Sequence, residues 1–336
     1  MEKSFALEPP NEIKPMDEIH LAKVYIVMAT RNAGVFLRSQ IVSIQNQTHS
    51  NWALWIRDDY SSDGTAERLN EWADDVRINL LSPRSYGEGA AHAFFDALQS
   101  IPKEADYFAF CDQDDVWIPS KLELSIKKIK GLEADHPGEP CLVHSDMRVV
   151  NESLKPIADS FFKYQGLSPT SRNSLKDLLV QNHVTGCTTL FNRPLLERVL
   201  QGGFPDSVCM HDWWIALVAA ASGHIGTIDH ALVWYRQHAS NDTGAREHSF
   251  IKGIGVFFSN PINEILKMRN SLERTRIQAG FFLKLHGNYL SSADVSLLSR
   301  YSRLGYQAPF KRRFQMFSLR IYKSNFSKTI AMYLFT

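Results

Sequence analysis

Apolar runs of strand length alternate with amphipathic helical patterns along the first 120 residues. Four runs are typical of buried strands because they are short, almost wholly apolar and bounded by polar turns: residues 22–29, 52–57, 76–81 and 107–111. Between them, apolar residues recur at helical spacing in three segments: 36–46, 66–74 and 86–100. This alternation predicts an α/β fold with a doubly wound, mostly parallel sheet.

The alternation continues less regularly to about residue 245. Helical patterns cover residues 121–132, 175–180, 193–200 and 211–222, and strand patterns cover residues 141–144, 184–191 and 225–234. Beyond this region the pattern becomes helical, basic and aromatic. We therefore expect a poorly ordered leader over 1–21, an α/β domain over 22–245 and a helical C-terminal region over 246–336.

Polar clusters follow three of the predicted strands. They cover residues 30–32, 58–63 and 112–115. In doubly wound sheets, ligands bind beyond the carboxyl ends of the strands. The three clusters should therefore converge on one crevice.

Three carboxylates are concentrated in the segment 111–117, Cys-Asp-Gln-Asp-Asp-Val-Trp. They are Asp112, Asp114 and Asp115, and they directly follow an apolar strand. Carboxylates this close repel one another unless a divalent cation neutralises them. A cation held there would be well placed to bind a diphosphate. The alternative interpretation is an acidic turn after an edge strand.

Composition narrows the class of protein. With 336 residues, 44% of them hydrophobic and 22% charged, the chain is long enough for one large or two ordinary globular domains. A formal net charge of +1 disfavours a nucleic-acid partner. The four cysteines include no Cys-x-x-Cys pair, which predicts reduced, mostly buried thiols. We expect a cytoplasmic protein, because neither a signal peptide nor a membrane-spanning apolar stretch is evident.

The order of the motifs is informative. Thr-Arg-Asn follows the first strand, Asp-Asp-Tyr-Ser-Ser-Asp-Gly-Thr follows the second, and Asp-Gln-Asp-Asp-Val-Trp comes after the fourth. Residues 235–244 read Tyr-Arg-Gln-His-Ala-Ser-Asn-Asp-Thr-Gly. Together these motifs resemble the inverting glycosyltransferases of family 2, which have a GT-A-type, Rossmann-like fold. The last two are particularly similar to bacterial rhamnosyltransferases of polysaccharide assembly, and the resemblance covers residues 22–245.

This resemblance implies a nucleotide-sugar donor, dTDP- or UDP-linked. Thr30 and Asn32 would frame its base, and Asp59 would accept a hydrogen bond from N3–H of uracil or thymine. Asp58 or Asp63 would instead position the second loop or cap the next helix. Further donor contacts are implied for Gly87, Asp112, Arg236 and Gln237. Gly87 could also be a simple helix entry, and His92 departs from the Asn that related sequences place in the following helix.

The resemblance also implies a divalent cation, Mg²⁺ or Mn²⁺. Asp112 and Asp114 would bind it through oxygen, as hard cations prefer. His238 would be a third ligand by analogy with related transferases, or a structural histidine.

Inverting transfer requires a carboxylate that deprotonates the acceptor hydroxyl. Asp212, at the start of a predicted helix, matches the base of the family. The alternative is an acidic residue favoured by the helix dipole. The acceptor or sugar pocket would be formed by Asp115, Trp117, Gly186, His211 and Trp213. Asp115 could instead pair with Lys121, His211 is expected to orient its loop, and Trp213 could pack in the core.

The C-terminal region is strongly polarised. After Asp294 the chain has eight basic and no acidic residues, interleaved with aromatic ones. This predicts an amphipathic surface that contacts an anionic leaflet, and through it a lipid-linked saccharide. The alternative is a helical cap that packs on the catalytic domain or forms a homodimer.

The leading hypothesis is a metal-dependent transfer of L-rhamnose from dTDP-rhamnose to a saccharide of a cell-surface polymer. One alternative keeps the site but uses a UDP-hexose donor. Another is a non-catalytic module that binds a sugar nucleotide or glycan. A dinucleotide-dependent oxidoreductase is disfavoured, because the first strand is not followed by Gly-x-Gly-x-x-Gly.

Overall fold

The computed structural model describes residues 18–82, 89–168, 173–205, 207–239, 241, 261–324 and 326–335. Its centre is one mixed sheet with the strand order β3-β2-β1-β4-β8-β6-β9-β5, and β7 pairs with β6. The strands are β1 (Val24–Thr30), β2 (Trp52–Asp58), β3 (Ile78–Leu81), β4 (Tyr107–Cys111), β5 (Val116–Trp117), β6 (Cys141–Asn151), β7 (Pro156–Ala158), β8 (Leu190–Asn192) and β9 (His224–Gln237).

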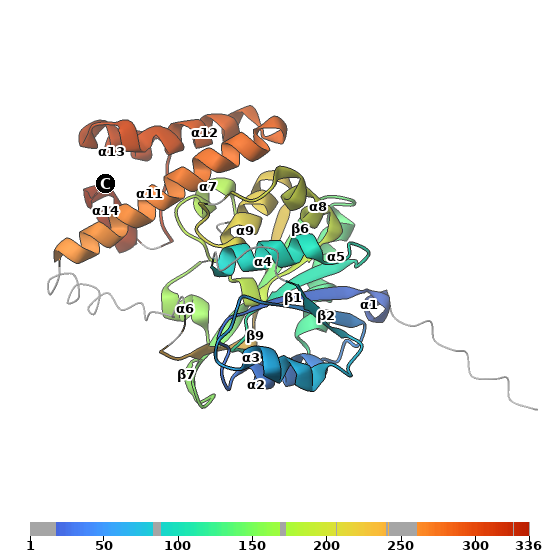
Figure 1. Ribbon diagram of the computed structural model, residues 1–336. Helices are drawn as coiled ribbons and strands as arrows, with labels where there is room; N and C mark the ends of the chain where they lie inside the picture. Colours follow the sequence, from blue (N-terminus) through green and yellow to red (C-terminus); the bar gives the residue numbers. More distant parts are fainter. Residues whose placement is uncertain are drawn as a thin grey trace, which may run out of the picture.

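Helices cover both faces of this sheet (Figure 1). The first face packs against α4 (Ala90–Ser100), α8 (Arg193–Gly202) and α9 (His211–Ser222). The second packs against α2 (Leu37–Gln45), α3 (Thr65–Leu69) and α5 (Lys121–Asp135). Shorter helices are α1 (Glu18–Leu21), α6 (Phe161–Gln165) and α7 (Leu175–Leu178).

Strand β1 shows why its sequence folds this way. Tyr25 and Val27 lie in the core on the α4 side, whereas Val24, Ile26 and Met28 lie in the core on the α2 side. Successive side chains of a strand point to opposite faces, so a strand buried on both faces must be continuously apolar. The four predicted N-terminal strands are confirmed, although the third begins at Ile78 and is not buried on both faces.

The sheet is parallel only in part. Strands β3, β2, β1 and β4 are mutually parallel, and β6 is parallel to β9. Strand β8 runs antiparallel to both β4 and β6 and joins the two halves. The strand predicted over 184–191 is therefore mostly wrong: residues Gly186–Thr188 form a 3-10 turn, and the strand β8 covers only Leu190–Asn192. Hydroxyls of Thr188 and Thr189 donate to carbonyls three residues earlier, which curls this segment.

The C-terminal helices form a separate layer beside α7, α8 and α9 (Figure 1). They are α11 (Pro261–His286), α12 (Ser292–Ser302), α13 (Pro309–Ser318) and α14 (Phe326–Phe335). Phe282 of α11 packs edge-on against Trp214 of α9, with ring centroids 5.4 Å apart. Gln278 accepts a hydrogen bond from the Cys209 backbone at 2.8 Å. Of the helices described, none is both long and apolar enough to cross a membrane.

Burial of the thiols agrees with the sequence: all four cysteines are free and buried.

The contact between α8 and the end of α11 predicts the effect of one substitution. In Gly202→Ala, the new Cβ would lie 1.9 Å from Cε1 of His286, so the α11 end must move. We expect the free energy of unfolding to fall by about 1–3 kcal/mol, measured by urea denaturation. The control is Gly131→Ala in α5, whose Cβ meets open space and which should gain about 0.5–1 kcal/mol. Equal stability of Gly202→Ala and the parent protein would show that α11 is not docked there.

Candidate active site

Loops after β1 and β2 interlock at the carboxyl end of the sheet. The Thr30 hydroxyl donates to Asp58 Oδ1 at 2.8 Å. Asn32 Oδ1 accepts a hydrogen bond from the Ser62 backbone at 2.8 Å, and Asp63 accepts from the backbones of Gly34 and Thr65, both at 3.0 Å. Asp58 and Asp63 therefore position the loops, as one alternative proposed. The side chain of Asn32 also holds the two loops together, through Ser62, and it does not line the cavity described below.

Asp59 is the carboxylate that these loops present. It is almost fully buried, and its Oδ1 accepts from Nη1 of Arg57 at 2.9 Å. Arg57 also donates to Asp96 of α4 at 2.7 Å. Nη1 of the more exposed Arg31 lies 3.9 Å from Asp59 Oδ2. Asp59 is thus fixed in direction by its arginine partner, as a hydrogen-bond acceptor for a base must be.

The acidic segment after β4 is tied to the loops and to β9. Gln113 both accepts from and donates to the backbone of Arg31. Asp114 Oδ2 lies 2.7 Å from Nε2 of His238, and Asn241 donates to the same oxygen at 3.4 Å. Asp114 and His238, both predicted as metal ligands, are therefore in contact, although the two residues are 124 positions apart.

Asp115 has a different environment. It is fully buried, and its Oδ1 accepts from the Arg236 backbone at 2.9 Å. Burial, followed by the charges of Asp114 and Asp112, raises the pKa of Asp115 well above its usual value. The alternative pairing with Lys121 is wrong, because the Lys121 amine lies 3.6 Å from the centre of the Trp117 ring.

Trp117 does not line the pocket that we expected it to line. The ring is 2% exposed and packs in the core with α2 and α5. Its backbone N–H donates to the Ser43 hydroxyl at 3.0 Å. The residue fixes the short strand β5 and has no access to a ligand.

Arg236 also differs from expectation. Its guanidinium donates to the backbone carbonyls of Asp114 and Glu152 and to the Ser39 hydroxyl, and it stacks over Phe36 at 4.7 Å. These contacts use the planar fork that would otherwise bind a phosphate. Gln237 donates to the Arg236 carbonyl at 3.3 Å. Neither side chain lines the cavity, so Arg236 braces the acidic segment from behind.

Asp212 lies in the first turn of α9. Its Oδ2 accepts from the Gly186 backbone at 2.9 Å, and Oδ1 accepts from Asn182 Nδ2 at 3.2 Å. Burial raises the pKa of Asp212 to about 6, although these and neighbouring backbone N–H groups oppose the shift. A carboxylate with this pKa can accept a proton near neutral pH.

His211 and Gly186 fix the position of Asp212. The His211 ring stacks on Phe94 with centroids 3.9 Å apart and meets Phe110 edge-on at 4.7 Å. Burial lowers its pKa to about 3, so the ring is neutral and orients the loop, as expected. A Cβ on residue 186 would lie 2.8 Å from Nε2 of His211. Only glycine brings this backbone close enough to hydrogen-bond Asp212.

One cavity of about 340 Å³ is lined both by the loops after β1, β2 and β4 and by the start of α9. Carboxylates Asp59, Asp112 and Asp114 line one part, and Asp212 lines another. Other residues predicted from the sequence that line it are Thr30, Gly186 and His211. His238 joins the site through Asp114. Gly87 falls outside the described residues, and His92 packs edge-on against Phe204 at 5.7 Å.

A second cavity, of about 770 Å³, opens on the other side of Asp212. Trp213 lines it, as predicted for an acceptor pocket, and donates to the Leu178 carbonyl at 2.6 Å. Sequence reasoning missed much of its wall: Asn182, His183 and Tyr235, and Lys267, Asn270, Ser271 and Arg274 of α11. Only the charge pattern of α11 could have indicated these last residues.

The fold and this geometry agree with what comparison finds. The family model for glycosyl transferase family 2 matches residues 25–200, just over half of the chain. The chain belongs to glycosyl transferase family 2.

Two relatives of this family 2 transferase illustrate its range. The UDP-Glc:alpha-D-GlcNAc-diphosphoundecaprenol beta-1,3-glucosyltransferase WfgD of Escherichia coli is 27% identical, over 74% of this chain and 91% of that one. The dTDP-rhamnosyl transferase RfbG of Shigella flexneri is 25% identical, over 65% and 74% of the two chains.

Solved structures confirm the GT-A architecture. TarS of S. aureus, in complex with UDP-GlcNAc, superposes with a TM-score of 0.55 at 15% identity, over 92% of this chain and 78% of that one. The mannosyltransferase PcManGT of Pyrobaculum calidifontis, in complex with GDP-Man and Mn²⁺, gives 0.51 at 19% identity, over 93% and 86%.

The pKa of Asp212 predicts how activity depends on pH. If this carboxylate is the base of the family 2 transferase, it must be ionised, and it becomes protonated as the pH falls through about 6. We expect kcat/KM to rise about tenfold per pH unit below this value and to level off above it. Donor affinity measured at the same pH values should change little. A profile that is flat from pH 5 to 8 would contradict the assignment.

Proposed function

We propose that this transferase moves L-rhamnose from dTDP-rhamnose, with inversion, onto a lipid-linked saccharide in cell-surface polysaccharide assembly. The observation that carries the proposal is the position of Asp212. Its buried carboxylate, with a pKa of about 6, lines the same cavity as Asp112 and Asp114. A proton acceptor thus shares one enclosed space with a cluster of metal-binding carboxylates.

The reaction that this arrangement supports is a direct displacement. Asp212 takes the proton of the acceptor hydroxyl, and the acceptor oxygen forms a bond to the anomeric carbon. The bond from that carbon to the dTDP oxygen breaks on the opposite face, so the configuration inverts. Asp212 ends protonated and the nucleoside diphosphate leaves as an anion.

The donor site fits a divalent cation. Among the described residues that line the smaller cavity, four are carboxylates and Arg31 is the single lysine or arginine. A diphosphate would be repelled there unless a cation offset the charge. We assign Mg²⁺ or Mn²⁺ to Asp112, Asp114 and His238, because Asp112 and Asp114 line this cavity and His238 contacts Asp114. Asp114 Oδ2 and His238 Nε2 are hydrogen-bonded to each other at 2.7 Å, so these two side chains would have to turn toward a shared ion. The cation, when bound, would stabilise the charge on the leaving diphosphate.

The identity of the donor base and of the donor sugar rests on separate observations. Asp59 accepts from an N3–H that thymine and uracil share, so it does not distinguish dTDP from UDP. The motif over 235–244 and the dTDP-rhamnosyl relative favour rhamnose. The UDP-glucose-dependent relative supports a UDP-hexose as the second candidate. A non-catalytic binding module is disfavoured, because such a module would not need both the acidic cluster and the buried base.

The larger cavity supports a lipid-linked acceptor. It begins at Asp212 and extends to Lys267 and Arg274 of α11. Arg274 donates to the Cys209 carbonyl at 3.0 Å, which holds its guanidinium at the cavity wall. Cationic groups in the same cavity as the base would suit the phosphates that link a saccharide to its lipid. The acceptor named for the first relative carries such a diphosphate.

Helix α13 supports contact with the inner face of the plasma membrane. Phe310, Phe314 and Phe317 recur at positions i, i+4 and i+7 and are 83%, 68% and 65% exposed. Lys311 and Arg313 flank them and are also exposed. An unpartnered aromatic face with basic neighbours is typical of helices that lie in an anionic membrane interface.

Two substitutions should separate cation binding from proton transfer. In a donor panel with Mn²⁺, we expect release of dTDP from dTDP-rhamnose. Asp114→Asn should weaken donor binding, whereas Asp212→Asn should bind donor normally and lower kcat about 10²–10⁴-fold. Asp229→Asn, an exposed carboxylate of β9, is the matched control and should behave as the parent. Release of UDP from a UDP-hexose alone would establish the second donor instead, and identical defects in both variants would refute the division of roles.

Membrane contact can be tested by sedimentation with vesicles. The full chain should pellet with vesicles rich in anionic lipid and much less with zwitterionic ones. Replacing Phe310, Phe314 and Phe317 by Ser, or deleting residues 309–336, should reduce the bound fraction several-fold. Binding that these changes leave intact would exclude α13 as the contact. Loss of a dimer, measured by light scattering, would show that a second copy covers the helix.

A further inference from the structure

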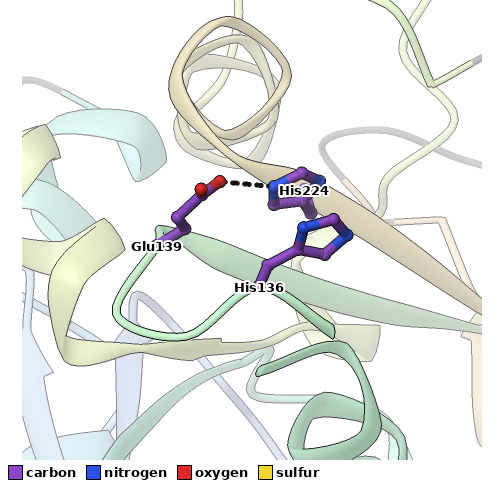
Figure 2. A group of neighbouring side chains, drawn as sticks. All are labelled: His136, Glu139 and His224. Atoms are coloured by element: carbon purple, nitrogen blue, oxygen red, sulfur yellow. Dashed lines mark hydrogen bonds and ion pairs between the residues drawn. The ribbon is translucent and has the colours of Figure 1, made fainter. Parts of the chain in front are cut away.

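A cluster of two histidines and a glutamate lies at the amino-terminal end of two neighbouring strands. His136 follows α5, Glu139 lies in the turn before β6, and His224 begins β9. Strands β6 and β9 are parallel, with Cys141 opposite His224, so both strand starts lie together. Figure 2 shows the three side chains converging from the turn and the strand.

The geometry of this cluster fits a metal ion. One potential ligand atom from each residue lies within 4.8 Å of the other two. Nε2 of His224 is 2.6 Å from Glu139 Oε2, and the two imidazole rings are stacked with centroids 3.4 Å apart. Because the lone pair of a ring nitrogen lies in the ring plane, the imidazoles would have to turn out of this parallel stack to place two nitrogens and one oxygen around a single ion. A His₂Glu set with one open position suits Zn²⁺ and similar transition ions.

The backbone beneath the cluster is already fixed. The His224 N–H donates to the Pro140 carbonyl at 2.9 Å, and the Glu139 N–H donates to the His136 carbonyl at 3.3 Å. Asn192 donates to the Glu139 carbonyl at 2.9 Å. A Cβ on Gly223 would lie 1.9 Å from the Pro140 carbonyl oxygen, so turn and strand are in close contact. The backbone that carries the three ligands is therefore in place before an ion binds, and only the side chains would have to turn.

A simple ion pair does not account for the whole cluster. The bond between Glu139 and His224 is partly exposed to solvent, and pairs of this kind stabilise a protein little. It also leaves unexplained why His136 stacks directly on His224. A shared ion gives all three side chains a common partner.

We propose that His136, Glu139 and His224 bind a divalent transition ion, with Zn²⁺ as the fitting example, which fastens the α5–β6 turn to the start of β9. The site is distinct from the donor cation site. Strand β9 runs from His224 to Gln237, and about 40 Å of extended chain separates its ends at roughly 3.3 Å per residue. Its role is thus in stability and does not depend on the proposed sugar transfer.

The test uses the full chain, free of any purification tag and stripped with chelator. Zn²⁺ is titrated by calorimetry in the presence of excess Mg²⁺, and melting temperature is followed in parallel. We expect one Zn²⁺ per chain and a rise of a few degrees in melting temperature. His224→Ala and His136→Gln should each weaken Zn²⁺ binding at least tenfold, without altering the melting temperature in chelator by more than a degree or two.

Two control variants make the result decisive. His230→Gln, an exposed histidine on the same strand, and Asp114→Asn, in the donor site, should both retain the Zn²⁺ affinity of the parent. If Asp114→Asn abolishes binding and His224→Ala does not, the ion belongs to the donor site and the proposal is wrong. Absence of any Zn²⁺ binding at micromolar concentrations by the folded parent protein would equally overturn it.

Discussion

Three carboxylates within four residues at the end of a buried strand are the constraint on which the site depends. The structure holds each one differently. Asp114 contacts His238, and Asp115 is buried against the Arg236 backbone, while Asp112 faces the cavity. Arg236 lies at the end of β9, and His238 lies just beyond it. The acidic segment and that end of β9 therefore stabilise each other, because losing either would leave charged groups without compensation.

The two cavities that Asp212 lines differ in the charge of their walls. In the proposed function the smaller cavity binds the donor; among the described residues its wall has four carboxylates and Arg31, so a diphosphate would need a cation there. On the acceptor side the wall contains Lys267 and Arg274. Asp212 lies between them, dry enough for its pKa to reach about 6 and anchored by the Gly186 backbone. In the proposed reaction, Asp212 takes a proton from the acceptor on one side while negative charge develops on the donor diphosphate on the other.

Much of this could be predicted from the sequence, because strand and helix periodicity is local and parallel strands bring their ends together. The convergence of the loops after β1, β2 and β4 follows from that rule alone. Side-chain partners are not local. Arg236 donates to Ser39, which is 197 residues away in the sequence. Trp117 is buried among core residues that include those of α2 and α5, and the sequence around Trp117 does not indicate this packing. Residue type suggested ligand contacts for both, and long-range packing decided otherwise. The wall contributed by α11 was hidden for the same reason.

Strand β9 begins at His224, in the histidine and glutamate cluster, and ends at Gln237, next to the acidic segment. It is not a regular strand between these ends. Its pairing with β6 shifts register around Asp146. There the Asp146 side chain accepts from the backbones of Met147 and Phe162 and so holds α6 against the sheet. A bulge increases local twist and bends a strand. The extra residues lie on β9, because Ile228 pairs with Ser145 and Ala231 pairs with Asp146, so β9 bends between His224 and Arg236.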